Sequence, residues 1–249
     1  MKIVDAHAYV GNSLFDQGQT PDELLRQMDF YGVDQAILIP CRPKSYDIIP
    51  ANSMVAKVVL RYPDRFMGFA RVDPWQGQAA LDELKRAYET LGLCGLLLHP
   101  WEELFQIASH KVDTLVEYTA THGLPVMVEA GYPLLSHPLD IAELAGRHPK
   151  ATIIATHGLQ LDDAGFALID AELAMHERAN IIMETSGMVA PEVMENIVRD
   201  LGAERLMFGS HTPWLDLHME IERVRLLNLT LEQKELVMGG NILKLLNGA

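Results

Sequence analysis

The sequence predicts one closed (β/α)8 barrel, or TIM barrel, and three observations favour this fold class. Short β-rich apolar runs recur at eight places along the chain. Amphipathic segments that carry helix start and end signals lie between these runs. The length of 249 residues suits such a barrel as a single unit. We therefore expect one domain over residues 1–249, a distorted barrel with C-terminal helices that close it.

The strand-like runs are rich in Ile, Val, Leu and Met, as expected for buried strands of a parallel sheet. They fall near residues 3–9, 35–40, 66–72, 94–99, 125–130, 152–157, 180–186 and 205–210. Their alternation with helices favours a closed barrel over an open doubly wound sheet. No GxGxxG motif follows the first run, which argues against a dinucleotide-binding fold.

The helical segments are predicted from their capping residues as much as from their periodicity. Thr20 can cap a helix in which Pro21 occupies the first turn, and Gly32 ends it. By the same signals we expect helices near residues 21–31, 49–62, 79–90, 112–122, 139–147 and 192–201. The tail over residues 231–246 is predicted to form one or two helices that close the barrel.

Composition excludes several classes of function. A net charge of −14 without a Lys/Arg stripe argues against nucleic acid or an anionic membrane as the main partner. Two cysteines exclude a disulfide framework and a thiolate zinc cluster. The N-terminus lacks a leader pattern, and no apolar run reaches the roughly 18 residues of a membrane span. We expect a cytoplasmic protein with a small-molecule substrate, and a homodimer is left open.

Six of the apolar runs finish on, or just before, an ionisable side chain. These are His7, His99, Glu129, His157, Glu184 and His211. The carboxyl ends of the strands in a (β/α)8 barrel meet at one rim, where active sites lie. The pattern therefore predicts a shared pocket.

Glu129 gives the strongest single signal because it interrupts an apolar run. Burying a lone carboxylate costs several kcal/mol unless a cation, a metal or hydrogen-bond donors compensate it. The structural alternative is a salt bridge to an interior arginine such as Arg71. Two or three imidazoles and one carboxylate form an ordinary ligand set for Zn²⁺ or a similar ion.

The other ionisable residues have less specific signals. Glu184 can act as an acid–base group or support a metal ligand. His99 can face the substrate or satisfy a turn. Arg42 and Arg71 can hold a substrate carboxylate through paired hydrogen bonds, or form ordinary ion pairs.

Several of these segments together resemble the amidohydrolase superfamily, specifically its amidohydrolase-2 branch. They are Asp5-Ala6-His7, Leu98-His99-Pro100, Thr156-His157-Gly158, Glu184-Thr185-Ser186-Gly187, Phe208-Gly209-Ser210 and Gly240-Asn241-Ile242. The resemblance runs over essentially the whole chain. It implies a TIM-barrel metal-dependent hydrolase or decarboxylase.

The metal motif differs from that family's pattern at three positions. Tyr9 stands where the strand-one motif has a second histidine, and Glu129 stands where strand five has histidine. His211 stands where strand eight has aspartate. Metal binding therefore carries over directly only to His7, while His157 matches the strand-six histidine. Because one carboxylate and one imidazole have exchanged places, we hypothesise that His7, Glu129 and His211 still hold an ion, with His157 as a further ligand or an acid–base group.

The function expected first is a hydrolase of a small, carboxylated lactone, ester or amide, using water activated by one divalent ion. Zinc is the expected ion, with manganese as the alternative. His157 and Glu184 are the predicted catalytic residues, and the predicted substrate-binding residues are Tyr9, Arg42, Arg71 and His99. Two enzymatic alternatives stay open on the same barrel, a decarboxylase and a metal-free lactonase. A non-catalytic binding or regulatory barrel is the alternative from another class.

Overall fold

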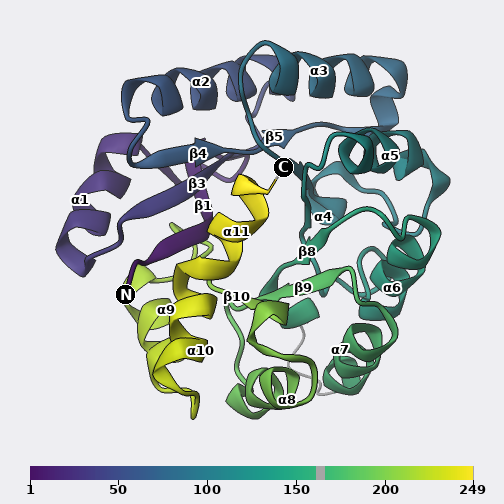
Figure 1. Ribbon diagram of the computed structural model, residues 1–249. Helices are drawn as coiled ribbons and strands as arrows, with labels where there is room; N and C mark the ends of the chain where they lie inside the picture. The colour runs from purple at the N-terminus through teal and green to yellow at the C-terminus, as the bar shows by residue number, and fades with distance from the viewer. Residues whose placement is uncertain (161–165, 249) are drawn as a thin grey trace.

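A computed structural model describes residues 1–160 and 166–248. Its parallel strands curve around a common axis with helices outside them (Figure 1). One sheet contains β1 (Val4–Asn12), β3 (Gln35–Pro40) and β4 (Phe66–Gly68). The other runs through β5 (Ala70–Arg71), β6 (Leu96–Leu98), β7 (Val126–Val128), β8 (Ile153–Ala155), β9 (Ile181–Glu184) and β10 (Leu206–Met207). The predicted TIM barrel is confirmed.

Backbone hydrogen bonds join the two sheets at both of their meeting points. The predicted strand over 66–72 is divided into β4 and β5 at Phe69, whose N–H donates to the Leu38 carbonyl at 3.0 Å. This one run therefore pairs with β3 on one side and β6 on the other. At the opposite seam, the Ala6 N–H donates to the Phe208 carbonyl at 3.1 Å and closes β1 against β10.

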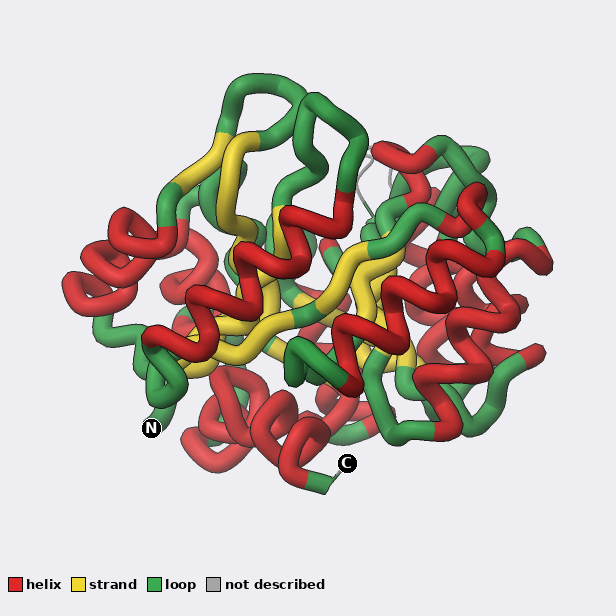
Figure 2. The backbone as a smooth tube through the Cα atoms, turned by 90° about the horizontal axis from the view of Figure 1, so that it is seen from above, coloured by secondary structure: helices red, strands yellow, loops and turns green. Residues whose placement is uncertain are grey.

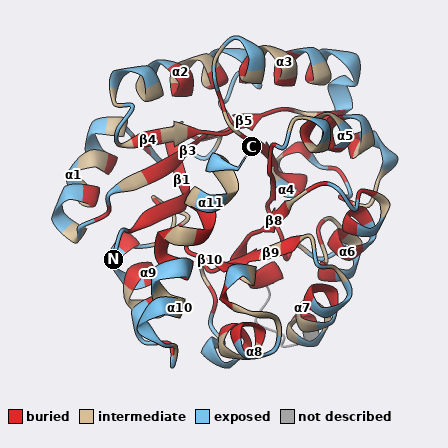
Figure 3. Cartoon of the chain, viewed as in Figure 1, coloured by how far each residue is buried: buried red, intermediate tan, exposed pale blue. Residues whose placement is uncertain are grey.

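The helices pack their apolar faces on the outside of the strands, and Figure 3 shows buried inner faces and exposed outer ones. The longer ones are α1 (Pro21–Tyr31), α2 (Ile48–Arg61), α3 (Gln78–Glu89), α5 (Asp113–Thr121), α6 (Pro138–Arg147), α7 (Phe166–Glu177), α8 (Pro191–Leu201) and α9 (Leu217–Arg225). The predicted helices all form, and α7 and α9 add to them. Among the described residues no helix combines the length and apolarity that crossing a bilayer requires.

Shorter elements shape the two ends of the barrel. Near the carboxyl ends of the strands lie β2 (Gly18–Gln19), antiparallel to β1, and the one-turn helix α4 (Pro100–Glu103). Single turns are η1 (Pro74–Gln76), η2 (His110–Val112), η3 (His157–Leu159) and η4 (Ala203–Arg205). The predicted tail helices are α10 (Leu231–Glu235) and α11 (Asn241–Asn247), joined by the π turn η5 (Leu236–Gly240).

Side-chain alternation divides the core into an inner and an outer part. Leu97, Met127 and Ile154, at the middle of β6, β7 and β8, belong to the cluster inside the barrel. Their strand neighbours belong to the larger cluster beneath the helices. Ile242 of α11 joins the inner cluster and closes the end away from the long loops, as Figure 2 shows for the C terminus. The same alternation points Glu129, two residues after Met127, into the barrel.

A register shift in β1 turns the first residues of the site toward the interior of the barrel. Val4 and Ala6 belong to the inner cluster, whereas Ala8 belongs to the outer one. The pairing of β1 with β3 shifts between Asp5 and Ala8, which is where the alternation changes phase. Because of this irregularity His7 and Tyr9 face the interior, where a regular strand would have turned them outward.

The Asp5 carboxylate stabilises this irregular segment. It is buried and accepts hydrogen bonds from the His7 N–H at 3.0 Å and from the Ser210 N–H at 2.9 Å. The Ser210 hydroxyl donates to it at 2.6 Å. Asp5 therefore links β1 to the segment after β10.

We expect Asp5→Ala to lower the free energy of unfolding by about 3 kcal/mol, because it leaves buried N–H groups without an acceptor. Chemical denaturation would measure this. Asp29→Ala is the control, since Asp29 forms an ion pair with Arg65 at 2.7 Å with 65% of its side chain exposed. That variant should lose less than about 1 kcal/mol. Equal losses in the two variants would contradict the assigned role of Asp5.

A second carboxylate, that of Asp113, holds α5 to the segments around it. Its Oδ1 accepts from His148 at 2.8 Å and from Arg147 at 3.0 Å, and its Oδ2 contacts His110 at 2.6 Å. Burial by itself raises the pKa of Asp113, but the hydrogen bonds from His148, His110 and Arg147 outweigh it and lower the pKa to about 2.

A carboxyl group whose pKa is lower in the folded state contributes stability above its unfolded pKa and loses it on acidification. Wild type should therefore lose an increment of unfolding free energy as the pH falls from 3.8 to about 2. Asp113→Asn should not show this loss of unfolding free energy on acidification. Asp47→Asn should show the same loss as wild type, because Asp47 is exposed and its side chain forms no cap bond. Parallel acid-unfolding curves for wild type and Asp113→Asn would contradict this prediction.

Candidate active site and metal centre

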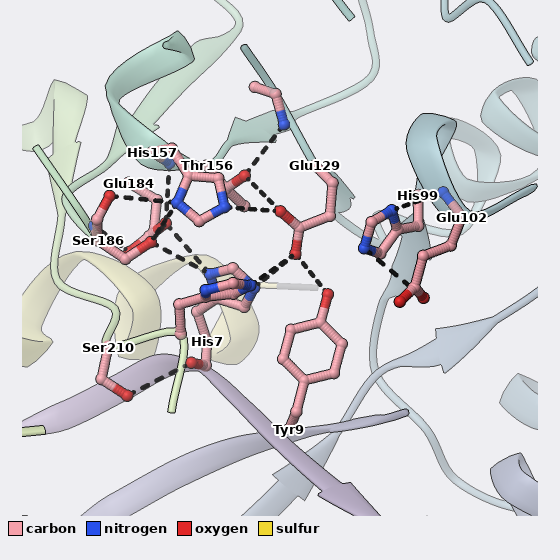
Figure 4. A network of polar contacts seen from close by, with 12 residues as sticks. His7, Tyr9, His99, Glu102, Glu129, Thr156, His157, Glu184, Ser186 and Ser210 are labelled. Atoms are coloured by element: carbon pink, nitrogen blue, oxygen red, sulfur yellow. Dashed lines mark hydrogen bonds and ion pairs between the residues drawn. The ribbon is translucent and has the colours of Figure 1, made fainter. Parts of the chain in front are cut away.

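The site is built around Glu129, which follows β7 and is completely buried. Figure 4 shows polar side chains directed at its carboxylate from several strands. Its backbone N–H donates to the Leu98 carbonyl at 3.0 Å, which continues the pairing of β7 with β6. The carboxylate is therefore fixed by the barrel itself rather than by a loop.

Four donors lie on the two oxygens of Glu129. Oε1 is 2.8 Å from His7 Nε2 and accepts from the Tyr9 hydroxyl. Oε2 is 2.8 Å from His157 Nε2 and accepts from the Thr156 hydroxyl at 3.0 Å. Among the described residues Glu129 is thus paired with histidines and hydroxyl groups, and not with an interior arginine as the structural alternative had it.

The charges in this cluster favour one another's ionised forms. Burial by itself raises the pKa of Glu129, but the charges of His7 and His157 and their hydrogen bonds hold it well below its usual range. Burial by itself lowers the pKa of His7, yet the charge of Glu129 and hydrogen bonds to Glu129 and Glu184 raise it to about 10. Glu129 and His7 therefore form a buried ion pair when no metal ion intervenes.

Glu184 supports His7 from the other side of the ring. Its Oε2 lies 3.2 Å from His7 Nδ1 and accepts from the Ser186 hydroxyl at 2.7 Å. Its Oε1 accepts from the Ser186 N–H at 2.7 Å. Gly209 permits this approach, because a Cβ there would lie 2.3 Å from Glu184 Oε1. A carboxylate on Nδ1 orients the His7 ring so that Nε2 faces Glu129.

His157 is held in an uncommon backbone conformation, with φ 56°. Its N–H donates to Glu184 Oε2 at 3.3 Å, while its Nδ1 lies 3.2 Å from the Ser186 carbonyl oxygen. Its Nε2 faces Glu129. A ring with an acceptor at each nitrogen can hold a proton at either position, which suits a group that stores and releases one.

His211 also has a positive φ, 54°, and approaches Glu129 from the segment after β10. Its Nε2 lies 3.9 Å from Glu129 Oε1. Burial, followed by the charge of His157, holds the pKa of His211 well below its usual range, so the ring is neutral. A neutral imidazole is the form that binds a metal ion.

His7, Glu129 and His211 offer ligand atoms that all lie within 4.8 Å of one another. Two imidazoles and a carboxylate suit Zn²⁺ or Mn²⁺, and Glu184 supplies the carboxylate that commonly orients a metal-binding histidine. The residues present therefore fit a divalent ion. His157, the fourth predicted ligand, lies on the other oxygen of Glu129 and outside this group.

A pocket of about 240 Å³ opens above this cluster. Five of its lining residues are aromatic: Tyr9, Phe15, Trp101, Tyr132 and Trp214. Trp101 and Tyr132 stack with their ring planes 4° apart. His99, His211, Glu102 and Gln17 complete the lining, and none of the described residues lining it is a lysine or arginine.

The four predicted substrate-binding residues divide into two pairs. Tyr9 and His99 line the pocket, whereas Arg42 and Arg71 do not. Arg71 is fully buried, and its guanidinium bonds Glu103 at 2.7 Å and also Glu102. The structure therefore places Arg71 in an internal ion pair, the structural alternative given above.

Sequence reasoning missed the supporting polar residues and the pocket walls. Thr156 carried a usable signal, because it lies two residues after the inward-facing Ile154. Ser186, two residues after Glu184, carried a similar one. The aromatic walls gave no signal, because Trp101, Tyr132 and Trp214 lie in segments far apart in the sequence.

A family model described as Amidohydrolase matches residues 5–248. A γ-resorcylate decarboxylase from Rhizobium radiobacter is 29% identical over 198 residues, which cover 71% of this chain and 58% of that protein. The chain thus spans under two thirds of that relative. The structure of 5-carboxyvanillate decarboxylase from Sphingomonas paucimobilis has a TM-score of 0.79 at 17% identity, over 99% of both chains.

A dihydroxybenzoic acid decarboxylase from Polaromonas sp. JS666 has a TM-score of 0.76 at 16% identity, over 99% of this chain and 97% of that one. Its structure contains manganese and the inhibitor 2-nitroresorcinol. The relatives that these comparisons name are decarboxylases, whereas the function expected first for this chain is a hydrolase.

We expect protein stripped of metal to bind one Mn²⁺ per chain in a calorimetric titration. Glu184→Gln should weaken binding by about 10–100-fold, because it removes the group that orients His7. Glu129→Gln and His211→Ala should weaken it further. His99→Gln is the control, since His99 lines the pocket outside the ligand group. Substoichiometric binding in wild type, or unchanged binding in Glu129→Gln, would contradict the assignment.

Proposed function

The chain belongs to the amidohydrolase family, and on that premise we propose that it decarboxylates a small aromatic carboxylic acid. The observation that carries this proposal is the aromatic-walled pocket directly above the Glu129 cluster. Flat walls such as the stacked pair Trp101 and Tyr132 suit a planar ring. A volume of about 240 Å³ suits a small molecule.

A carboxylated substrate requires positive charge at the floor of this pocket. The described lining offers no lysine or arginine, Glu102 is part of it, and Glu129 Oε1 lies 3.9 Å from Nε2 of the lining residue His211. His7, Glu129 and His211 would hold a divalent ion there, either zinc or the manganese found in a structural relative. A bound ion would supply the positive charge that a substrate carboxylate requires at this floor.

The reaction breaks the bond between the ring carbon and the carboxylate carbon. The electron pair of that bond stays with the ring carbon, which takes up one proton, and carbon dioxide leaves. His157 is the residue we assign to hold that proton, because its two ring nitrogens face Glu129 and Ser186. Its ring lies 4.6 Å from that of His211, which lines the pocket.

The remaining residues position the reacting groups. The Tyr9 hydroxyl donates a hydrogen bond to Glu129. Burial and the charge of Glu129 raise the pKa of Tyr9 well above its usual value, so the hydroxyl stays protonated. Glu184 and Ser186 orient His7 and His157. The Trp214 ring stacks on the His211 ring, with the two ring centroids 5.2 Å apart, and so restricts its orientation.

The decisive experiment supplies Mn²⁺-loaded protein with two panels of compounds. One contains aromatic acids, including γ-resorcylate, and the other contains aryl esters, amides and lactones of similar size. We expect release of carbon dioxide from the first panel and no hydrolysis of the second. Hydrolysis without decarboxylation would overturn the proposal in favour of the hydrolase, and loss of both activities would favour a binding protein.

His157→Gln should lower kcat by about 100-fold or more, the usual contribution of a positioned proton donor. His176→Gln is the matched control, because His176 is exposed on α7 away from the pocket. Binding of a non-reacting analogue, followed by calorimetry, should be similar in both variants. An unchanged kcat in folded His157→Gln would remove His157 from the mechanism.

A further inference from the structure

One acidic side chain of the pocket has no part in the reaction described above. Glu102 lies on α4, three residues after His99, and lines the pocket although only 9% of its side chain is exposed. Its Oε2 accepts from Arg71 Nη2 and lies 3.7 Å from His99 Nε2. Figure 4 shows Glu102 and His99 on the side of Glu129 away from Glu184.

The second oxygen of Glu102 is an unused acceptor. The hydrogen bonds among the described residues include Oε2 of this side chain but not Oε1. Nor is Oε1 one of the fully enclosed polar atoms that lack a partner in the described part of the chain. Because Glu102 lines the pocket, a carboxylate oxygen that no described protein group bonds and that is not fully enclosed is available to a donor on the ligand.

The two arginines near this end of the pocket already form ion pairs with carboxylates. Arg71 bonds both Glu102 and Glu103, and Arg42 Nε lies 3.7 Å from Glu103 Oε1. Neither arginine lines the pocket. Among the described residues, this end of the pocket therefore offers a negative acceptor and no free cation, so it favours a hydroxyl or amino group and repels a carboxylate.

We propose that Glu102 is a specificity-determining residue that accepts a hydrogen bond from a hydroxyl or amino group on the substrate ring. The pocket then selects ring-hydroxylated or amino-substituted aromatic monoacids and rejects acids that place a second carboxylate at this end. The inference rests on the proposed function and names its substrate class. A site built to bond a hydroxyl discriminates strongly, because an analogue without it leaves the buried acceptor unpaired.

The test measures binding rather than turnover. Trp101 and Trp214 line the pocket, so quenching of tryptophan fluorescence reports occupancy without any reaction. The probes are resorcinol, its dimethyl ether 1,3-dimethoxybenzene, isophthalate and benzoate. In wild type we expect resorcinol to bind at least about tenfold more tightly than the ether, and isophthalate to bind more weakly than benzoate.

Glu102→Gln keeps the size of the side chain and removes its charge. The preference for resorcinol over its ether should fall by about tenfold in this variant, and isophthalate should bind more tightly than it does to wild type. Glu103→Gln is the matched control, because Glu103 bonds the same Arg71 but does not line the pocket. It should keep the wild-type preference.

A wild-type protein that binds resorcinol and its ether equally, or binds neither, overturns the inference, as does an unchanged preference in Glu102→Gln. If Glu102→Gln fails to fold, the wild-type ratio and turnover of γ-resorcylate against 2,6-dimethoxybenzoate decide. Equal turnover of those two acids overturns the inference and leaves the decarboxylase intact. Discrimination between the probes without decarboxylation of any acid overturns the proposed function alone.

Discussion

The buried carboxylate of Glu129 is the constraint on which the rest of the site depends. A charge at the centre of a barrel is costly unless several donors surround it, and His7, Tyr9, Thr156 and His157 provide them. Those residues come from β1, the end of β8 and the turn after it, so closing the barrel and neutralising the charge are coupled. The donors offset the cost of burying the Glu129 carboxylate. One of them, the His7 ring, would also be a metal ligand once a divalent ion replaced the proton between it and Glu129.

The convergence of these side chains on one point requires local irregularities in the backbone. The register shift in β1 turns His7 and Tyr9 inward, and Asp5 holds the shifted segment against Ser210. His157 and His211 occupy positive φ values that most residues avoid. Regular strands would present fewer groups to one point, so the irregularities lie where convergence requires them.

The electrostatic design of the pocket differs between its floor and its far wall. At the floor, neutral His211 and the His7–Glu129 pair provide the groups that suit a metal ion and hence an anionic substrate group. At the far wall, Arg71 pairs with Glu102 and Glu103, and the Glu102 side chain lines the pocket. The aromatic walls of the pocket suit a small planar ring, in agreement with the proposed function.

The sequence by itself determined the barrel and the place of Glu129 at the end of a buried strand, because apolar periodicity and chain order can be followed along the sequence. It also gathered His7, His99, Glu129, His157, Glu184 and His211 at one rim, since parallel strands share their carboxyl ends. Only the tertiary structure decided that Arg71 is consumed by Glu102 and Glu103, and that Trp101, Tyr132 and Trp214 form walls. Those outcomes depend on distances between segments far apart in the chain, and no local pattern encodes such distances.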